Sequence, residues 1–148
     1  MDATPQPSPS NVEQVVPFLR VSDMLRSIRF YCDGLGFLLK NKWVVDDELR
    51  WCWLNLGNAS IMLQTFAKQG QGAQPPGVLL GGGVSLCFQC KDALEIYHQL
   101  IARGIEACEP FVGNSMWVTN LTDPDGYRLE FESPTTAPEE TKFSDYKP

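Results

Sequence analysis

An internal repeat constrains the fold of this chain more than any other feature of its sequence. Residues 16–31 align on residues 85–100 at an offset of 69, and the matching pairs are Leu19 with Phe88, Asp23 with Asp92, and Leu25 with Leu94. After a slip of one residue, the segment 57–63 aligns on 126–131. A period of this length is too long for a solenoid repeat, so it indicates two fused copies of one module.

Each copy predicts one strand, one helix and then three strands. Asp23 and Asp92 occupy helix N-cap positions, where a carboxylate can accept hydrogen bonds from free backbone N–H groups. Gly34 and Gly104 are placed to end the two helices. Alternation of apolar and polar residues predicts strands at 14–21, 37–45, 49–56, 59–65, 83–89, 105–112, 116–121 and 127–132. The predicted fold class is α+β, with two tandem βαβββ modules forming a curved eight-strand cleft.

The apolar spacing of the helices predicts which of their residues face the core. The expected stripes are Met24, Leu25, Ile28, Tyr31, Cys32 and Leu35 in the first helix, and Ala93, Ile96, Tyr97, Leu100 and Ile101 in the second. We expect the first module at 13–66 and the second at 82–133. A linker rich in Gly, Gln and Pro spans 67–81, and the segments 1–12 and 134–148 are expected to be a mobile arm and a mobile tail.

Charge and composition exclude several classes of partner. The net charge of −6 argues against nucleic acid and anionic membranes, because both require a basic surface. No run of about 18 apolar residues is present, and the N-terminus has no signal-peptide pattern. The five cysteines suit a reducing compartment, so we expect a cytoplasmic protein. Cys87 and Cys90 form a C-x-x-C, but on a strand such positions point to opposite faces, which favours structural thiols.

Three stretches of the sequence resemble the vicinal oxygen chelate superfamily, which includes glyoxalase, extradiol dioxygenases, fosfomycin-modifying enzymes and bleomycin-resistance proteins. These stretches are residues 17–31, residues 35–37, and the turn Asp123-Pro124-Asp125-Gly126-Tyr127. Together with the repeat, the resemblance covers about residues 14–132. It implies paired βαβββ modules, a cleft that serves several chemistries, and a homodimer.

The resemblance places the family's metal ligands at Val16, Met62, Ser85 and Glu130, and only Glu130 is a competent donor. A catalytic metal ion needs about three protein N, O or S donors. His98 is the single histidine, so one chain cannot assemble the two-histidine, one-carboxylate iron site of the dioxygenases. We therefore expect no cofactor, and only a low-occupancy divalent ion at Glu130 is left open.

Strand alternation selects residues for a cleft with apolar walls and a few polar anchors. Trp51 and Trp53 share one face of their strand, and the opposite face would place Leu54 and Leu56 in the core. Glu130 either contacts a ligand or forms an ion pair with Arg20 or Arg128. The expected cleft residues are Val16, Phe18, Arg20, Trp51, Trp53, Met62, Gln64, Ser85, Cys87, Arg128, Glu130 and Glu132.

The sequence leaves three functional hypotheses. The first, closest to the bleomycin-resistance branch, is a homodimer that binds a small organic ligand, of cationic aromatic type, without a metal ion at the family positions. The second is a metal-dependent lyase or transferase of the glyoxalase kind that uses Glu130 with Glu132 or Cys87. The third is a non-catalytic module that binds a partner protein. The residues favour binding over catalysis, and a glyoxalase-like lyase over an extradiol dioxygenase if the chain is catalytic.

Overall fold

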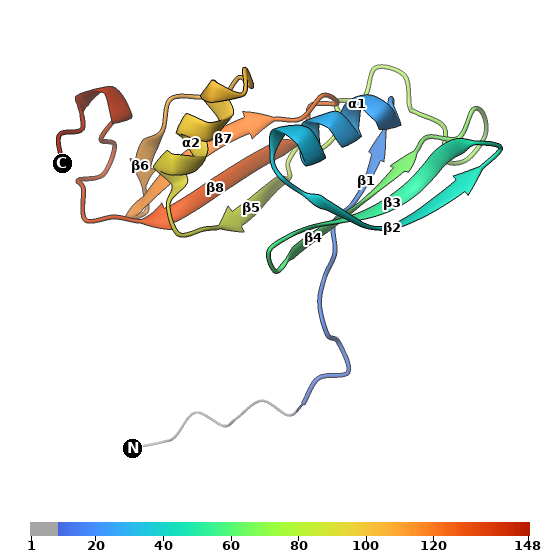
Figure 1. The fold of residues 1–148 in the computed structure, drawn as a ribbon, viewed down its shortest axis with the longest axis horizontal. Helices are drawn as coiled ribbons and strands as arrows, with labels where there is room; N and C mark the ends of the chain where they lie inside the picture. The colour runs from blue at the N-terminus through green and yellow to red at the C-terminus, as the bar shows by residue number, and fades with distance from the viewer. Residues whose placement is uncertain (1–8) are drawn as a thin grey trace.

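The computed structural model describes residues 9–148, which form two four-stranded sheets, each with a helix across one face (Figure 1). The first sheet has the strand order β1-β4-β3-β2 and the second has the order β5-β8-β7-β6. In each sheet the first strand runs parallel to the last strand of its module, and the other pairs are antiparallel. This topology confirms the predicted tandem βαβββ modules. Residues 1–8 of the predicted N-terminal arm lie outside the described residues.

The elements of the first module are β1 (Phe18–Val21), α1 (Met24–Ile28), η1 (Arg29–Gly34), β2 (Leu38–Val45), β3 (Glu48–Leu56) and β4 (Ala59–Thr65). Those of the second module are β5 (Ser85–Gln89), α2 (Ala93–Ala102), β6 (Phe111–Gly113), β7 (Met116–Thr122), β8 (Arg128–Pro134) and η2 (Phe143–Asp145).

Both helices begin at the predicted caps, but the first helix changes its winding. Asp23 accepts a hydrogen bond from the backbone N–H of Arg26, and Asp92 accepts two in the equivalent position. After α1 the chain continues as the π-helix η1, where the N–H of Leu35 donates to the carbonyl of Phe30 at 3.0 Å. The sequence prediction assumed 3.6 residues per turn throughout. The wider turn of η1 therefore changes which of its residues face the core.

Two residues of the predicted helix stripes face solvent instead of the core. Leu25 is 63% exposed and Ile101 is 50% exposed. Tyr31 and Leu100, at equivalent positions of the two modules, are fully buried as predicted. The core therefore uses narrower helix faces than the sequence indicates.

Two strands are shorter than the sequence predicts by four or more residues. β1 begins at Phe18, and residues 14–17, which the sequence predicts to belong to it, lie before the strand. β6 covers Phe111–Gly113 instead of 105–112. Ile105 packs into the main core instead of pairing in the sheet, and Pro110 has no N–H to offer a ladder.

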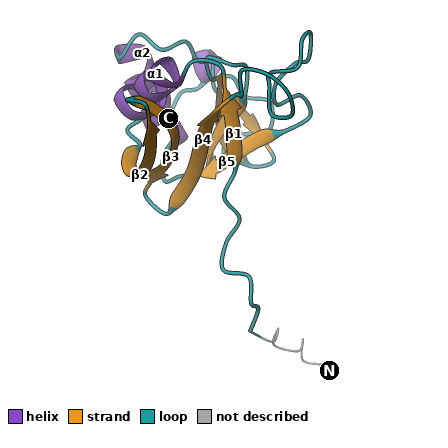
Figure 2. Ribbon diagram, turned by 90° about the vertical axis from the view of Figure 1, so that its right-hand side faces the viewer, coloured by secondary structure: helices purple, strands orange, loops and turns teal. Residues whose placement is uncertain are grey.

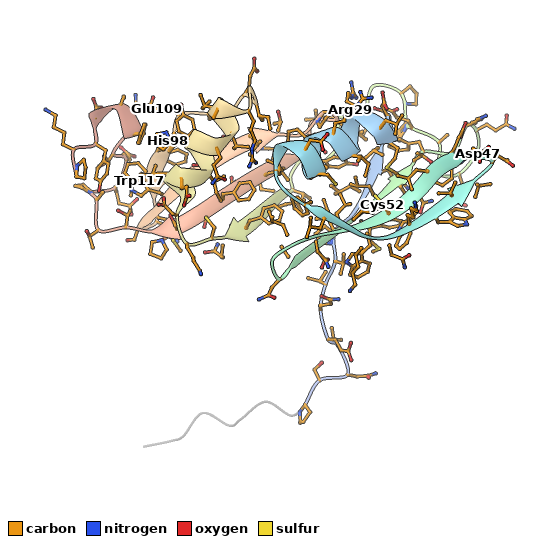
Figure 3. All side chains as sticks on the ribbon, viewed as in Figure 1. Arg29, Asp47, Cys52, His98, Glu109 and Trp117 are labelled. Carbon is orange, nitrogen blue, oxygen red and sulfur yellow. The ribbon has the colours of Figure 1, made fainter. Side chains whose placement is uncertain are left out.

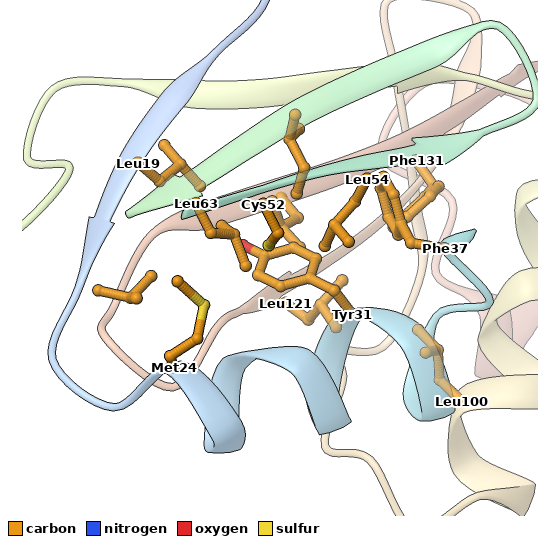
Figure 4. Packing of buried hydrophobic residues seen from close by; sticks show 13 residues of the cluster. Leu19, Met24, Tyr31, Phe37, Cys52, Leu54, Leu63, Leu100, Leu121 and Phe131 are labelled. Atoms are coloured by element: carbon orange, nitrogen blue, oxygen red, sulfur yellow. The ribbon is translucent and has the colours of Figure 1, made fainter. Parts of the chain in front are cut away.

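One apolar core extends through both modules (Figure 4). Tyr31, Phe37 and Leu54 from the first module pack together with Leu100 and Phe131 from the second. An edge-to-face contact joins Phe37 to Phe88 at 6.0 Å, and Phe88 stacks on Phe131 at 5.0 Å. Burial of each large apolar side chain contributes about 1.5–3 kcal/mol, so the two modules stabilise each other.

Residues 134–148, which the sequence predicts to be a mobile tail, contact the second module. Lys142 forms a β-bridge with Phe111, and Tyr146 packs edge-to-face on Trp117 at 5.0 Å. Phe143 contacts the ring of His98 on α2 at 5.3 Å. Figure 3 shows His98 and Trp117 in this half of the molecule. His98 thus contacts the tail while its side chain stays exposed.

None of the helices in the described chain has both the length and the apolar character needed to cross a bilayer.

A candidate ligand site on the open sheet faces

Each sheet has one face covered by a helix and one face without a helix (Figure 2). In β3, Cys52 and Leu54 are fully buried on the helix side. Since successive side chains of a strand point to opposite faces, Trp51 and Trp53 lie on the open face. The same alternation decides the position of every other strand residue predicted for the cleft.

The open face of the first sheet is aromatic and basic, and we call it the aromatic face. Its members lie in two cross-strand rows, Phe18–Met62–Trp53 and Arg20–Gln64–Trp51. Trp43 pairs with Trp51 at the outer end of the second row and is 56% exposed. These rings form an apolar surface on which a planar molecule can stack.

Two cations already contact rings of the aromatic face. The Nζ atom of Lys40 is 5.3 Å from the ring centre of Trp53, and the guanidinium of Arg20 is 4.5 Å from that of Phe18. Nη1 of Arg20 is buried and has no hydrogen-bond partner among residues 9–148. A buried N–H without a partner costs about 1–3 kcal/mol, so this group favours a ligand that carries an acceptor.

The open face of the second sheet is acidic, and we call it the acidic face. Its members from the predicted cleft are Ser85, Cys87, Arg128, Glu130 and Glu132. Cys87 pairs with Glu130 across β5 and β8, and Arg128 follows in the next row beside Ser85. Within residues 9–148 neither glutamate forms an ion pair. The predicted alternative, in which Glu130 pairs with Arg20 or Arg128, is therefore wrong.

Hydrogen bonding fixes one end of the acidic face. The side-chain amide of Gln89 donates to Oε2 of Glu132 at 3.1 Å and to Sγ of Cys87 at 3.2 Å. Burial, together with hydrogen bonding to Glu132, raises the pKa of the Cys87 thiol. The thiol is therefore protonated at neutral pH and behaves as a weak donor, so the charged groups of this face are Glu130, Glu132 and Arg128.

The metal site implied by the family resemblance does not fit these residues. Val16 lies before β1 and has an apolar side chain, and Met62 offers only a soft thioether. The hydroxyl of Ser85 is a poor ligand in its neutral form, so Glu130 is the single competent donor of the four. A different set is close together: one donor atom each from Cys87, Glu130 and Glu132 lies within 4.8 Å of the others.

The structure divides the predicted site residues into three groups. The aromatic face holds Phe18, Arg20, Trp51, Trp53, Met62 and Gln64, and the acidic face holds the five residues named above. Val16 lies apart in the segment before β1. Trp117, which strand symmetry relates to the tryptophans of the first module, is buried on the helix side against Tyr146.

Sequence reasoning missed Lys40 and Asn120, which also contribute to the open faces. Asn120 of β7 is the register partner of Glu130 in β8. Alternation along β7 could have predicted this position, because Asn120 lies on the same face as Thr122, the partner of Arg128. Lys40 could not, because a bulge between Leu39 and Asn41 breaks the alternation of β2.

Comparisons with known proteins agree with this architecture. The family model described as the Glyoxalase/Bleomycin resistance protein/Dioxygenase superfamily matches residues 12–131. No curated protein matches the sequence. Similar solved structures include TnmS3, an antibiotic binding protein from Streptomyces sp. CB03234, at 18% identity and a TM-score of 0.61, covering 85% of this chain and 100% of that one.

Two further structures are similar. TioX from Micromonospora sp. ML1 has 17% identity and a TM-score of 0.66, with 83% of this chain and 99% of TioX covered. A glyoxalase/bleomycin resistance protein/dioxygenase from Nocardioides has 17% identity and a TM-score of 0.63, with 88% and 89% covered. At these identities the likeness shows the fold alone.

Proposed function

Because the chain belongs to the Glyoxalase/Bleomycin resistance protein/Dioxygenase superfamily, we propose that it binds a small organic molecule between aromatic and acidic open faces, without a metal ion at the family's positions. The observation that carries the proposal is the division of side chains between these faces. One sheet presents Trp51 and Trp53, and the other presents Glu130 and Glu132 without ion-pair partners among residues 9–148.

The chemistry of the two faces favours a cationic aromatic ligand. The rings of Trp51 and Trp53 offer stacking surface, while the unpaired carboxylates attract positive charge. Lys40 already lies over Trp53, so the cation of the ligand belongs beside Glu130 and its aromatic part belongs on the tryptophans. TnmS3, which shares the fold, is described as an antibiotic binding protein, and this supports a small-molecule ligand.

We propose that two chains assemble the site as a homodimer. The open faces carry complementary charge: Arg20 and Lys40 lie on one, and on the other the two carboxylates of Glu130 and Glu132 outnumber the single cation of Arg128. A two-fold pair that places the aromatic face of one chain opposite the acidic face of the other forms two identical clefts. The five cysteines are free, which supports a reducing, cytoplasmic setting.

A tryptophan fluorescence titration with a simple aromatic amine tests the proposal. Quenching is expected to decrease when Trp51 or Trp53 is replaced by Phe. Trp117→Phe is the matched control, because Trp117 lies in the core on the helix side. Equal quenching in the Trp51→Phe, Trp53→Phe and wild-type proteins would contradict ligand binding at the aromatic face.

A second function, a metal-dependent lyase of the glyoxalase kind, is supported by the proximity of Cys87, Glu130 and Glu132. One thiolate and two carboxylates could supply three ligands to zinc and leave a position open. The raised pKa of Cys87 opposes it, since the thiol must lose its proton to bind the ion. Zinc titration of the wild type, Cys87→Ala and Glu132→Gln separates the two functions, because only the lyase requires stoichiometric zinc that both variants lose.

A further inference from the structure

The pseudo-symmetry of the fold creates two equivalent seams between the modules, and only one of them is filled. In the first seam, the turn at 123–127 of module two lies against the free edge of β1. The hydroxyl of Tyr127 donates to the backbone carbonyl of Arg20 at 2.8 Å. Its ring lies so close to Gly81 that a Cβ built there would be 2.6 Å from Cδ1 of Tyr127.

Further contacts close the first seam. The backbone N–H of Ser22 donates to Asp125 at 3.2 Å, and Arg26 lies 3.8 Å from the same carboxylate. Tyr31 donates to Asp123 at 2.8 Å underneath the turn. Side chains of module two therefore form hydrogen bonds with the free backbone groups at the edge of β1.

In the second seam, no side chain occupies the position equivalent to Tyr127 among the described residues. The repeat offset of 69 relates Arg20 to Gln89 and Tyr127 to Asn58, and the later one-residue slip would relate Tyr127 to Ala59. Neither Asn58 nor Ala59 has a side chain long enough to take the place of the Tyr127 ring. At this position the structure has a cavity of about 880 Å³, which is lined by Asn58 and Ala59 on one side, by β5 on the other, and by Gln14, Val15 and Pro17 of the segment before β1.

The backbone of β5 faces this seam cavity with unpaired groups. The N–H of Cys90 donates to the carbonyl of Glu132 at 2.9 Å, and Gln89 is the register partner of Glu132. In a parallel ladder this places alternate residues toward β8, so the N–H and C=O groups of Cys87 and Gln89 point away from β8 into the seam. They have no backbone partner among residues 9–148.

The walls of the seam cavity are apolar and carry almost no charge. Leu56, Leu86, Phe88, Ile96 and Phe131 contribute apolar surface. Arg103 is the one charged residue that lines it, and its Nη1 already donates to the carbonyl of Gly34 at 2.7 Å. Ser85 and Cys87 of the acidic face also line the seam cavity, but Glu130 and Glu132 do not, so the cavity differs from the acidic face in its charge.

We propose that the seam cavity is a second binding site, which takes a short, uncharged, extended peptide or peptide-like amide as an added strand on the edge of β5. Alternating backbone donors and acceptors match an extended amide chain, and the apolar walls accept its side chains. The volume lies within the range of about 300–1,000 Å³ that is typical of small-molecule sites, which selects a short segment over a folded partner. The proposal is independent of ligand binding at the open faces.

Calorimetric titration with the capped peptide acetyl-Val-Leu-Val-amide, together with ¹⁵N chemical-shift mapping, tests the site. We expect binding with the largest shifts at the amides of Cys87 and Gln89. The same peptide N-methylated at its two internal amides keeps its apolar side chains but loses donors, and it should bind roughly fivefold to tenfold more weakly. Equal binding of both peptides, or shifts centred on Trp51 and Trp53, would overturn the proposal.

A variant of the protein provides the complementary measurement. Cys87→Pro removes one N–H that points into the seam without removing a bond to β8, and proline is tolerated on such an edge. Cys87→Ala is the matched control, because it removes the thiol and keeps the N–H. Cys87→Pro should weaken peptide binding roughly fivefold relative to Cys87→Ala, and equal affinities would contradict edge pairing. Loss of peptide binding as protein concentration rises would assign the seam to residues 9–17 of another copy, which also overturns the proposal.

Discussion

The phenol oxygen of Tyr31 donates a hydrogen bond of 2.8 Å to Oδ2 of Asp123, and this buried pair joins the two modules across 92 positions of the sequence. Asp123 also accepts from the backbone N–H groups of Asp125 and Tyr127, both at 2.9 Å. Burial raises the pKa of the Asp123 carboxyl, and burial with the nearby carboxylate raises that of the Tyr31 phenol. The phenol thus remains a donor throughout the neutral range.

Tyr31→Phe is expected to destabilise the protein by about 1–3 kcal/mol at neutral pH, because it removes a donor from a buried carboxylate. The loss should be smaller in acid. Without Tyr31, ionised Asp123 is less satisfied, so its folded-state pKa rises further above the unfolded value. A raised folded-state pKa means that stability decreases as pH rises through the interval between the two values.

Urea unfolding of the wild type and Tyr31→Phe at several pH values measures this dependence. The difference in unfolding free energy should grow from acid toward neutral pH. A difference that is independent of pH would show that the Tyr31 hydroxyl does not interact with the ionised form of Asp123.

Gly81→Ala tests the closed seam. Gly81 has a φ of +71°, and an added Cβ would meet the ring of Tyr127. Gly77 has a similar φ of +69° with nothing within 4 Å, so Gly77→Ala is a control for backbone strain alone. Thermal unfolding should show a larger loss for Gly81→Ala, by about 1–3 kcal/mol, and equal losses would mean that the ring does not fix this seam.

The purified protein should contain no stoichiometric divalent ion at Val16, Met62, Ser85 and Glu130. The physical reason is that one competent donor is present where about three are required. Elemental analysis after purification without chelators measures the content. One zinc or nickel ion per chain that is lost in Glu130→Ala but retained in Cys87→Ala and Glu132→Gln would contradict the prediction.

The protein should be a dimer in solution. Complementary charge on the two open faces favours a closed two-fold pair. Sedimentation equilibrium at micromolar concentration should give twice the chain mass of 16.6 kDa. A single species at 16.6 kDa would count against a cleft shared between two subunits.

The sequence predicts the topology well because the signals that specify it are local. Asp23 and Asp92 cap their helices as expected, and alternation places Trp51 and Trp53 opposite the buried Cys52. Helical periodicity is less exact: it places Leu25 of α1 in the core although this residue is 63% exposed, and it does not predict the change to the π-helix η1.

Other features depend on contacts between distant segments and could not be predicted. The bond from Tyr31 to Asp123 and the packing of Tyr146 on Trp117 are examples. The open seam beside β5 is also of this kind, because the side chain of Asn58 is too short to fill the place that Tyr127 fills in the other seam, and only the symmetry of the folded modules reveals this difference.

The most direct test of the account compares a cationic aromatic ligand with its neutral isostere in the wild type and in Glu130→Gln. We measure affinity by tryptophan fluorescence quenching at two salt concentrations, using simple aromatic amines and bleomycin-like compounds. The account predicts tighter binding of the cation, and this preference should decrease in Glu130→Gln and at higher salt, because the charge of the ligand lies beside Glu130. Equal affinity for the cation and its isostere, or no change in Glu130→Gln, would contradict it.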